Sequence, residues 1–252
     1  MIIPIPKPGK DSYNPLNYRP IALTSCLCKT LERMINERLI WYLEKKGLLN
    51  KVQCGFRTHR CTIDHLIRLE TFIREAFANN EHLVAVFFDL EKAYDTTWKH
   101  GIMQDLHNMG LRGCLPIFIE NFLSNRTFRV LYGTKCSEEF VQEEGVPQGA
   151  ILSTTLFNVK INNITKCLQS NVDSSLYVDD FLIVYRSKRM SEIERKLQLT
   201  INKLQNWTFE NGFKISTNKT VCMHFCQKRK LHPDPELKLG NDMIKVVQQT
   251  KH

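Results

Sequence analysis

The sequence has no apolar stretch close to the roughly 20 residues that a membrane-spanning helix needs, which argues against a transmembrane protein. Met1 is followed at once by IIPIPKPGK, without the basic start and apolar core of a secretory signal. The nine cysteines are odd in number, so we expect free thiols in a reducing, intracellular compartment with no membrane partner.

Internal repeats, low-complexity tracts and flexible linkers are also absent, which favours one continuous unit of the α+β class. Helical spacing of apolar residues, among them Leu27, Leu31 and Met34 in the first segment, predicts several helices. Their expected ranges are 25–47, 62–79, 97–109, 115–123, 153–168 and 191–212, the last with a capping box of Ser191 and Glu194. Strands are predicted over 82–90, 174–185 and 219–227, with a further hairpin over 237–247.

Positive charge is in excess, with 35 Lys and Arg against 26 Asp and Glu, a net charge of +9 and a pI near 9.1. Such a balance makes a polyanionic partner plausible but is shared by many proteins that bind no nucleic acid.

Two adjacent aspartates, Asp179 and Asp180, interrupt the strand-forming run SSLYVDDFLIVY. Apolar flanks on both sides predict a hairpin packed into a sheet, with the two carboxylates at its tip. Adjacent carboxylates repel each other unless they are hydrated or share a cation, and oxygen ligands point to Mg²⁺. Alone, the pair is more often an ordinary exposed turn. Asp89 favours the metal interpretation, because it ends the apolar run HLVAVFFDL, where an unpartnered carboxylate would be costly.

Four segments stand in the order of polymerase motifs A to D: FFDLEKAYD at 87–95, EGVPQGAILSTTLFN at 144–158, YVDD at 177–180 and NGFKISTNKTVCMHF at 211–225. Together with IPKPGK, NYRPIALTSCLCKTLERMI and QCGFR upstream, they resemble the reverse transcriptases of non-LTR retrotransposons, in the jockey-like lineage. The resemblance implies a right-hand polymerase with fingers over about 1–82 and a palm over about 83–252, in which helices back an antiparallel sheet. It also implies a nuclear or nucleocytoplasmic location.

Carried over residue by residue, the resemblance implies that Asp89 and Asp179 bind two Mg²⁺ ions, for which Mn²⁺ could substitute. Asp180 would complete the acidic cluster and Leu90 would offer its backbone carbonyl. The implied reaction is attack of a primer 3′-hydroxyl on the α-phosphorus of a dNTP, directed by an RNA template and extending a DNA primer.

The resemblance also implies nucleotide-binding residues. Lys7 and Arg19 match positions that grip the triphosphate, and Tyr94 matches the position that excludes a 2′-hydroxyl. Gln148 and Gly149 would face the nucleotide and template. Lys219 matches a lysine proposed to protonate the leaving pyrophosphate. From the residues alone, Tyr94 could equally be a half-buried aromatic and Lys219 a surface lysine, and Asp95 reads as a helix cap or surface residue.

Three positions depart from the family pattern: Ala150 where serine is common, Thr154 where proline is frequent, and Val178 where alanine is usual. None removes a catalytic group. The family continues past VVQQTKH into a primer grip and a thumb, so we expect a partial chain that lacks the thumb and synthesises DNA weakly by itself. The oligomeric state is not predicted.

Other functions stay open on the residues. A catalytically dead remnant would bind nucleic acid without extending a primer, but all three aspartates are present. A two-metal nuclease also uses clustered carboxylates, but Tyr94 and the PQG segment at 147–149 weigh against it. The run CMHFC at 222–226 invites a zinc interpretation, which we disfavour because no second ligand pair follows at finger spacing.

Overall fold

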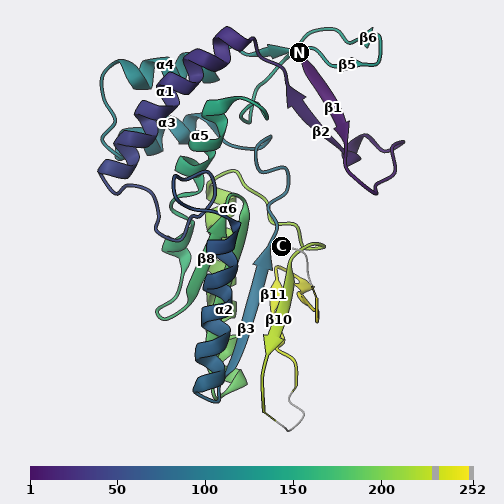
Figure 1. The fold of residues 1–252 in the computed structure, drawn as a ribbon. Coiled ribbons are helices and arrows are strands. Elements are labelled where there is room, and N and C mark those ends of the chain that lie inside the picture. Colours follow the sequence, from purple (N-terminus) through teal and green to yellow (C-terminus); the bar gives the residue numbers. More distant parts are fainter. Residues whose placement is uncertain (229–232, 250–252) are drawn as a thin grey trace. The chain divides into compact units, whose positions relative to one another are not determined.

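The computed structural model describes residues 1–228 and 233–249, and the chain divides into two compact units of mixed α and β structure. Unit 1 comprises Met1–Leu49 and Tyr94–Lys160, and unit 2 comprises Asn50–Ala93 and Ile161–His252. Each unit draws on two separate stretches of the chain, as the sequence colours of Figure 1 show.

A five-stranded sheet forms the centre of unit 2, with the strand order β13-β10-β3-β9-β8. The strands are β3 (His82–Phe88), β8 (Asp173–Tyr177), β9 (Asp180–Ser187), β10 (Val221–Phe225) and β13 (Lys245–Val246). All pairings are antiparallel except that of β10 with β13. Every residue of β3 is buried, as its continuous apolar run predicts for a strand with neighbours on both sides.

Two helices cover this sheet. α2 (Thr62–Ala78) packs its residues Leu69, Phe72 and Ile73 on the face that carries Leu83, Ala85 and Phe87. α6 (Met190–Glu210) covers the other face, where it contacts β9 and β3 (Figure 1). A short hairpin of β11 (Lys238–Leu239) and β12 (Asp242–Met243) lies within the predicted 237–247 segment and turns at Gly240. A 3-10 helix, η2 (Ile164–Cys167), packs on α6.

Unit 1 is mainly helical. Its helices are α1 (Cys26–Lys45), α3 (Lys99–Asn108), α4 (Cys114–Leu123) and α5 (Ile151–Ile161), and they enclose one apolar cluster. The hairpin of β1 (Ile2–Pro6) and β2 (Tyr18–Ala22), with the 3-10 turn η1 (Pro15–Asn17) between them, forms its amino-terminal part. Two small pairs, β4 (Thr127–Phe128) with β7 (Phe140–Val141) and β5 (Leu131–Tyr132) with β6 (Lys135–Cys136), complete it.

The helix from 191 was predicted with the wrong amino-terminal cap. α6 begins at Met190 after Arg189, which makes no side-chain cap, so the expected box of Ser191 and Glu194 does not form. The hydroxyl of Ser187 accepts instead from the Arg189 backbone N–H at 3.2 Å, and it donates to the carboxylate of Glu192 at 2.8 Å. The strand end therefore organises the start of this helix.

The apolar face expected for the first helix is also only partly correct. Leu27 and Met34 are 85% and 65% exposed, whereas Glu32 is buried. The Glu32 carboxylate accepts hydrogen bonds from the backbone N–H groups of Ile151 at 2.7 Å and Leu152 at 3.3 Å, which caps α5 from a distance. α5 itself is shorter than predicted, because it ends at Ile161 and a 3-10 turn follows.

All nine cysteines are free, as expected. Burial raises the pKa of the Cys167 thiol to about 11 and that of the Cys222 thiol to about 12, so both are neutral packing groups. Among residues 1–228 and 233–249, no helix is both long and apolar enough to cross a membrane.

A buried ion pair supports unit 1 and yields a stability prediction. The Lys160 ammonium, on a side chain 3% exposed, lies 3.2 Å from the Asp105 carboxylate and 5.4 Å from the centroid of the Trp98 ring. Lys160→Met removes the ammonium that pairs with the largely buried Asp105 carboxylate, so the free energy of unfolding should fall by about 3–5 kcal/mol. Urea unfolding followed by circular dichroism measures it.

The matched control is Arg129→Met, which breaks the exposed pair of Arg129 with Glu139 in the same unit. It should cost less than about 1 kcal/mol. Equal losses in the two variants would contradict a structural role for the buried pair.

Candidate active site

The ladder between β3 and β9 brings Asp89 and Asp180 together. Phe88 pairs with Phe181, and the centroids of their stacked rings are 6.0 Å apart. In this antiparallel register, Asp89, which follows Phe88, stands opposite Asp180, which precedes Phe181. Directly opposite residues of antiparallel strands have Cβ atoms roughly 5 Å apart. Alternation along the strands directs both carboxylates to the face of the sheet that carries Phe87.

Lys219 neutralises Asp89. Its ammonium nitrogen lies 2.7 Å from Asp89 Oδ2, with the lysine side chain 69% exposed and the aspartate 29% exposed. Lys219 comes just before β10, which pairs with β3, and so the sheet itself delivers the lysine to the carboxylate. The sequence grouped these two residues only through a family resemblance.

The backbone of Leu90 faces the same region. Its neighbours bond to the segment before β10, through Ser216 N–H to Asp89 C=O at 2.8 Å and Glu91 N–H to Lys214 C=O at 2.8 Å. Leu90 and Ile215 are therefore a non-hydrogen-bonded pair, whose own N–H and C=O groups point away from each other's strand. On β3, that direction is the side of β9 and Asp180.

The turn that carries Asp179 is strained. Tyr177 pairs with Asp180, so Val178 and Asp179 form a two-residue loop. Val178 has a φ of 60°, in the left-handed region that a β-branched residue rarely adopts and that glycine ordinarily fills at the first position of such turns. The fold nevertheless accommodates Val178 in this turn, and strain of this kind is typical of functional sites.

Gln53 holds the strained turn in place. Its buried side-chain amide accepts from the backbone N–H of Val178 at 2.9 Å and donates to the backbone C=O of Val178 at 3.2 Å. The same side-chain oxygen accepts from Gly55 N–H at 2.8 Å. A Cβ on Gly55 would lie 2.4 Å from a Val178 methyl and 2.6 Å from its backbone nitrogen, so only glycine fits.

Sequence analysis missed this role of Gln53, although QCGFR contains both residues. Gln53 and Gly55 belong to no periodic apolar pattern, and the partner of Gln53 lies 125 residues away. The sequence offers only one signal, which is that QCGFR belongs to the segments that resemble the family.

Lys7 and Arg19 lie together in unit 1. Lys7 N–H bonds to Asn17 C=O and extends the β1–β2 ladder, in which Arg19 pairs with Ile5. Because Lys7 and Ile5 are two residues apart, Lys7 and Arg19 project from one face of the hairpin, roughly 7 Å apart along it. The Lys7 ammonium donates to the Leu16 carbonyl at 3.1 Å, and the Arg19 side chain is exposed.

Gln148 and Gly149 form a turn against the end of β2. Ala22 N–H donates to Gln148 C=O at 2.7 Å, and Gly149 has a φ of 106°, where a Cβ would lie 2.9 Å from the Ala22 carbonyl oxygen. The Gln148 side-chain amide donates to Asp95 Oδ1 at 2.9 Å, so Asp95 holds this turn and does not cap a helix, contrary to the first of its two expected roles.

The Tyr94 ring has a defined support. It stacks on Phe157 of α5, with ring centroids 4.7 Å apart and an interplanar angle of 18°. Tyr94 is partly buried against the core of unit 1, as both of its expected roles allow.

The three aspartates are not gathered into a compact donor group. In the part of the chain that the structure describes, the one set of three ligating side chains whose donor atoms lie within 4.8 Å of one another is His82, His224 and Cys226. Carboxylates without a cation between them repel, and Asp89 pairs with Lys219. The donors are all oxygens at one end of adjoining strands, which suits a hard divalent cation such as Mg²⁺.

Comparison with known protein families identifies the family of this chain. The family described as "Reverse transcriptase (RNA-dependent DNA polymerase)" matches residues 5–249. The chain belongs to the reverse transcriptase family. Members of this family typically use divalent metal ions and act on nucleic acids.

Curated relatives come from non-LTR retrotransposons, as the sequence predicted. The probable RNA-directed DNA polymerase from transposon BS of Drosophila melanogaster is 30% identical over 100% of this chain and 28% of its own length. The RNA-directed DNA polymerase from mobile element jockey is 28% identical in Drosophila funebris, with the same coverage. The chain thus spans about 28% of the length of these relatives.

Solved structures share the reverse transcriptase fold. Telomerase from Candida tropicalis, in complex with a TWJ fragment of telomeric RNA, aligns with a TM-score of 0.63 at 15% identity, over 99% of this chain and 45% of the telomerase chain. Telomerase from Candida albicans aligns with a TM-score of 0.54 at 13% identity, over 88% of this chain and 41% of that chain. At such identities the likeness concerns the fold alone.

The clamp on the strained turn yields a second prediction. Gln53→Leu removes the hydrogen bonds to Val178 and leaves buried backbone groups unsatisfied, so the free energy of unfolding should fall by about 2–3 kcal/mol in urea titrations. Gln198→Leu is the control, since Gln198 makes the same two bonds to the backbone N–H and C=O of Lys238 at a solvent-accessible position.

Water can replace the bonds of Gln198, so its loss should cost less than about 1 kcal/mol. If Gln53→Leu were as mild as the control, the turn would not depend on this clamp.

Proposed function

We propose that this chain supplies the catalytic part of an RNA-directed DNA polymerase of retrotransposon origin, transferring a nucleotide from a dNTP to a DNA primer on an RNA template. The observation that carries the proposal is the opposition of Asp89 and Asp180 at one end of the β3–β9 ladder, with Asp179 beside them in a strained, clamped turn. In right-hand terms, the sheet bearing these residues is the palm, and the part before about residue 82 supplies the fingers. The expected absence of a thumb stays a prediction.

Asp89, Asp179 and Asp180, with the Leu90 carbonyl, are the proposed ligands of two Mg²⁺ ions. The chemistry that Mg²⁺ supplies at such a site is activation of the attacking hydroxyl and neutralisation of charge on the leaving oxygen. The chain contributes the geometry. Its ladder register fixes Asp89 against Asp180, and Gln53 holds the Val178–Asp179 turn, so the carboxylates need little reorganisation for the reaction.

Residues of unit 1 are proposed to bind the incoming nucleotide. Lys7 and Arg19 share one face of a hairpin, which suits a triphosphate with its several anionic oxygens. Gln148 and Gly149 form a turn whose backbone is pinned to the same hairpin through Ala22. The stacked ring of Tyr94 is held firmly enough to exclude a 2′-hydroxyl and so to select deoxynucleotides.

Lys219 is proposed to act twice. Its ammonium first balances the charge of Asp89. With Asp89 engaged as a metal ligand, Lys219 would be free of that pair at the edge of the site and could donate a proton to the departing pyrophosphate. The exposure of its side chain supports such a movement.

Single-turnover extension of a primed RNA template by one dNTP, with protein in excess, tests the function without requiring processive synthesis. Asp179→Asn should lower the rate more than about 100-fold, because it removes a charged group at the reacting centre. Asp173→Asn makes the same change at the far end of the same hairpin and should leave the rate unchanged.

Equal rates for the two variants would refute the assignment of Asp179. Salt-dependent binding of the primed template by wild type, with no extension, would indicate the dead remnant. Release of labelled nucleotides in the absence of dNTPs would indicate a nuclease.

Competition between Lys219 and a metal ion gives another prediction. Lys219→Met should tighten Mn²⁺ binding about two- to fivefold, since exposed pairs contribute up to about 1 kcal/mol. Titration of free Mn²⁺ by electron paramagnetic resonance measures the affinity, and the same variant should extend the primer more slowly.

Lys214→Met is the control, because Lys214 forms the same kind of exposed pair, with Glu91 at 3.0 Å, and removes the same charge. Weaker Mn²⁺ binding by Lys219→Met than by the control would rule out displacement of the lysine by the metal.

A further inference from the structure

A second group of ligating side chains lies at the opposite end of β3. His82 is the first residue of β3, and in the antiparallel register His224 pairs with Val84, so Cys226 continues the ladder opposite His82. Alternation then places His82, His224 and Cys226 on one face of the sheet. Asp89 stands roughly 23 Å away, at about 3.3 Å per residue along β3.

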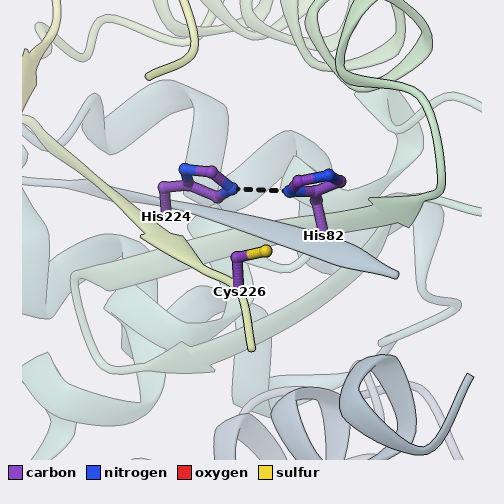
Figure 2. A group of neighbouring side chains, drawn as sticks. All are labelled: His82, His224 and Cys226. Atoms are coloured by element: carbon purple, nitrogen blue, oxygen red, sulfur yellow. Dashed lines mark hydrogen bonds between the residues drawn. The ribbon is translucent and has the colours of Figure 1, made fainter. Parts of the chain in front are cut away.

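The donor atoms of these three side chains converge. His82 Nδ1 and His224 Nε2 are 3.0 Å apart, and all three donor atoms lie within 4.8 Å of one another. Figure 2 shows the two imidazole rings directed at each other, with the Cys226 side chain beside the gap between them. We propose that His82, His224 and Cys226 bind a zinc ion.

The spacing of the two ring nitrogens fits neighbouring positions of tetrahedral zinc, in which the three side chains would supply three of the four ligands. Zinc bonds of about 2.0–2.1 Å to nitrogen and 2.3 Å to sulfur place two ligand nitrogens about 3.3 Å apart and a nitrogen and a sulfur about 3.6 Å apart. The two ring nitrogens would separate by a few tenths of an ångström. Two imidazoles and a thiolate are donors that zinc accepts and Mg²⁺ does not favour.

Asp234 orients one of the ligands. Its Oδ1 lies 3.5 Å from His224 Nδ1, on the ring nitrogen opposite the one that faces His82. A carboxylate at this position favours the proton on Nδ1 and leaves the lone pair of Nε2 for a metal. Carboxylates behind ligating histidines are a recurrent feature of zinc sites.

The surroundings also suit a thiolate and a closed site. The backbone N–H of Lys228 donates to Cys226 Sγ at 3.4 Å, a bond that stabilises negative charge on sulfur. His82 is 3% exposed and the His224 side chain 8% exposed, so the two nitrogen donors are largely shielded from solvent.

Bound zinc would tie the amino end of β3 to the carboxyl end of β10. Asp89 follows the other end of β3, and Lys219 precedes the other end of β10. The ion would therefore hold these two strands together far from the reacting groups. Its role is structural. From the sequence, zinc at CMHFC is disfavoured because no second ligand pair follows at finger spacing, whereas the fold brings the further ligand, His82, from another strand.

Cobalt substitution tests the site on the whole chain. Protein freed of metal with a chelator and titrated with Co²⁺ should bind one ion per chain, with a thiolate-to-cobalt charge-transfer absorption that equimolar Zn²⁺ removes. Cys226→Ser should abolish this absorption. Cys136→Ser, at an exposed cysteine of β6, should retain it. Absence of the absorption in wild type, or its persistence in Cys226→Ser, would overturn the proposal and leave an ordinary histidine pair.

A second variant keeps the test independent of folding. Asp234 is exposed, so Asp234→Asn should preserve the fold while it raises the Zn²⁺ dissociation constant about 10–100-fold. Asp242→Asn, at an exposed aspartate on β12, should leave it unchanged. If both variants bound Zn²⁺ like wild type, the proposed role of Asp234 in orienting His224 for the metal would be wrong.

The outcome is separable from polymerase activity. Asp179→Asn should bind Co²⁺ and Zn²⁺ with wild-type affinity and spectrum, because Asp179 lies at the other end of the sheet. A chain that binds zinc and fails to extend a primer would count against the proposed function alone.

Discussion

The pairing of β3 with β9 is the constraint on which the candidate active site depends. Side chains alternate between the two faces of a sheet, so a slip of one residue would turn Asp89 into the core and bring Phe88 to the site. The stacked rings of Phe88 and Phe181 prevent such a slip, because both are fully buried on the face opposite the aspartates. Apolar packing thus fixes the position of the charged groups that follow it.

The hairpin tip shows the opposite balance, because its geometry is unfavourable by itself. Valine at a φ of 60° would relax in a free hairpin, and two adjacent aspartates repel each other. Gln53 and Gly55 oppose this relaxation from a segment more than 100 residues away in sequence. The strained Val178 turn therefore depends on Gln53 and Gly55 for its conformation.

Much of the site could be predicted from sequence, because β3 and the 174–185 hairpin are long apolar runs with charges at fixed places. The predictions failed where a partner is remote. Glu32 disrupts the expected apolar face of α1 because it caps α5, and Ser187, on the preceding strand, replaces Ser191 at the start of α6. Local patterns record propensity and periodicity. They do not record which distant backbone group needs a hydrogen-bond partner.

β3 carries different donor chemistry at its two ends, and this difference bears on how two metal sites could coexist in one sheet. The carboxylates beyond its carboxyl end are hard oxygen donors that suit Mg²⁺, whereas the imidazoles and thiol at its amino end suit zinc. Zinc binds carboxylates as well, so donor type alone would not protect the oxygen site. The nitrogen and sulfur group is the preferred zinc ligand set, and at limiting zinc it would hold the ion away from the aspartates. The proposed structural site would then also keep the catalytic end of the same strand available for magnesium.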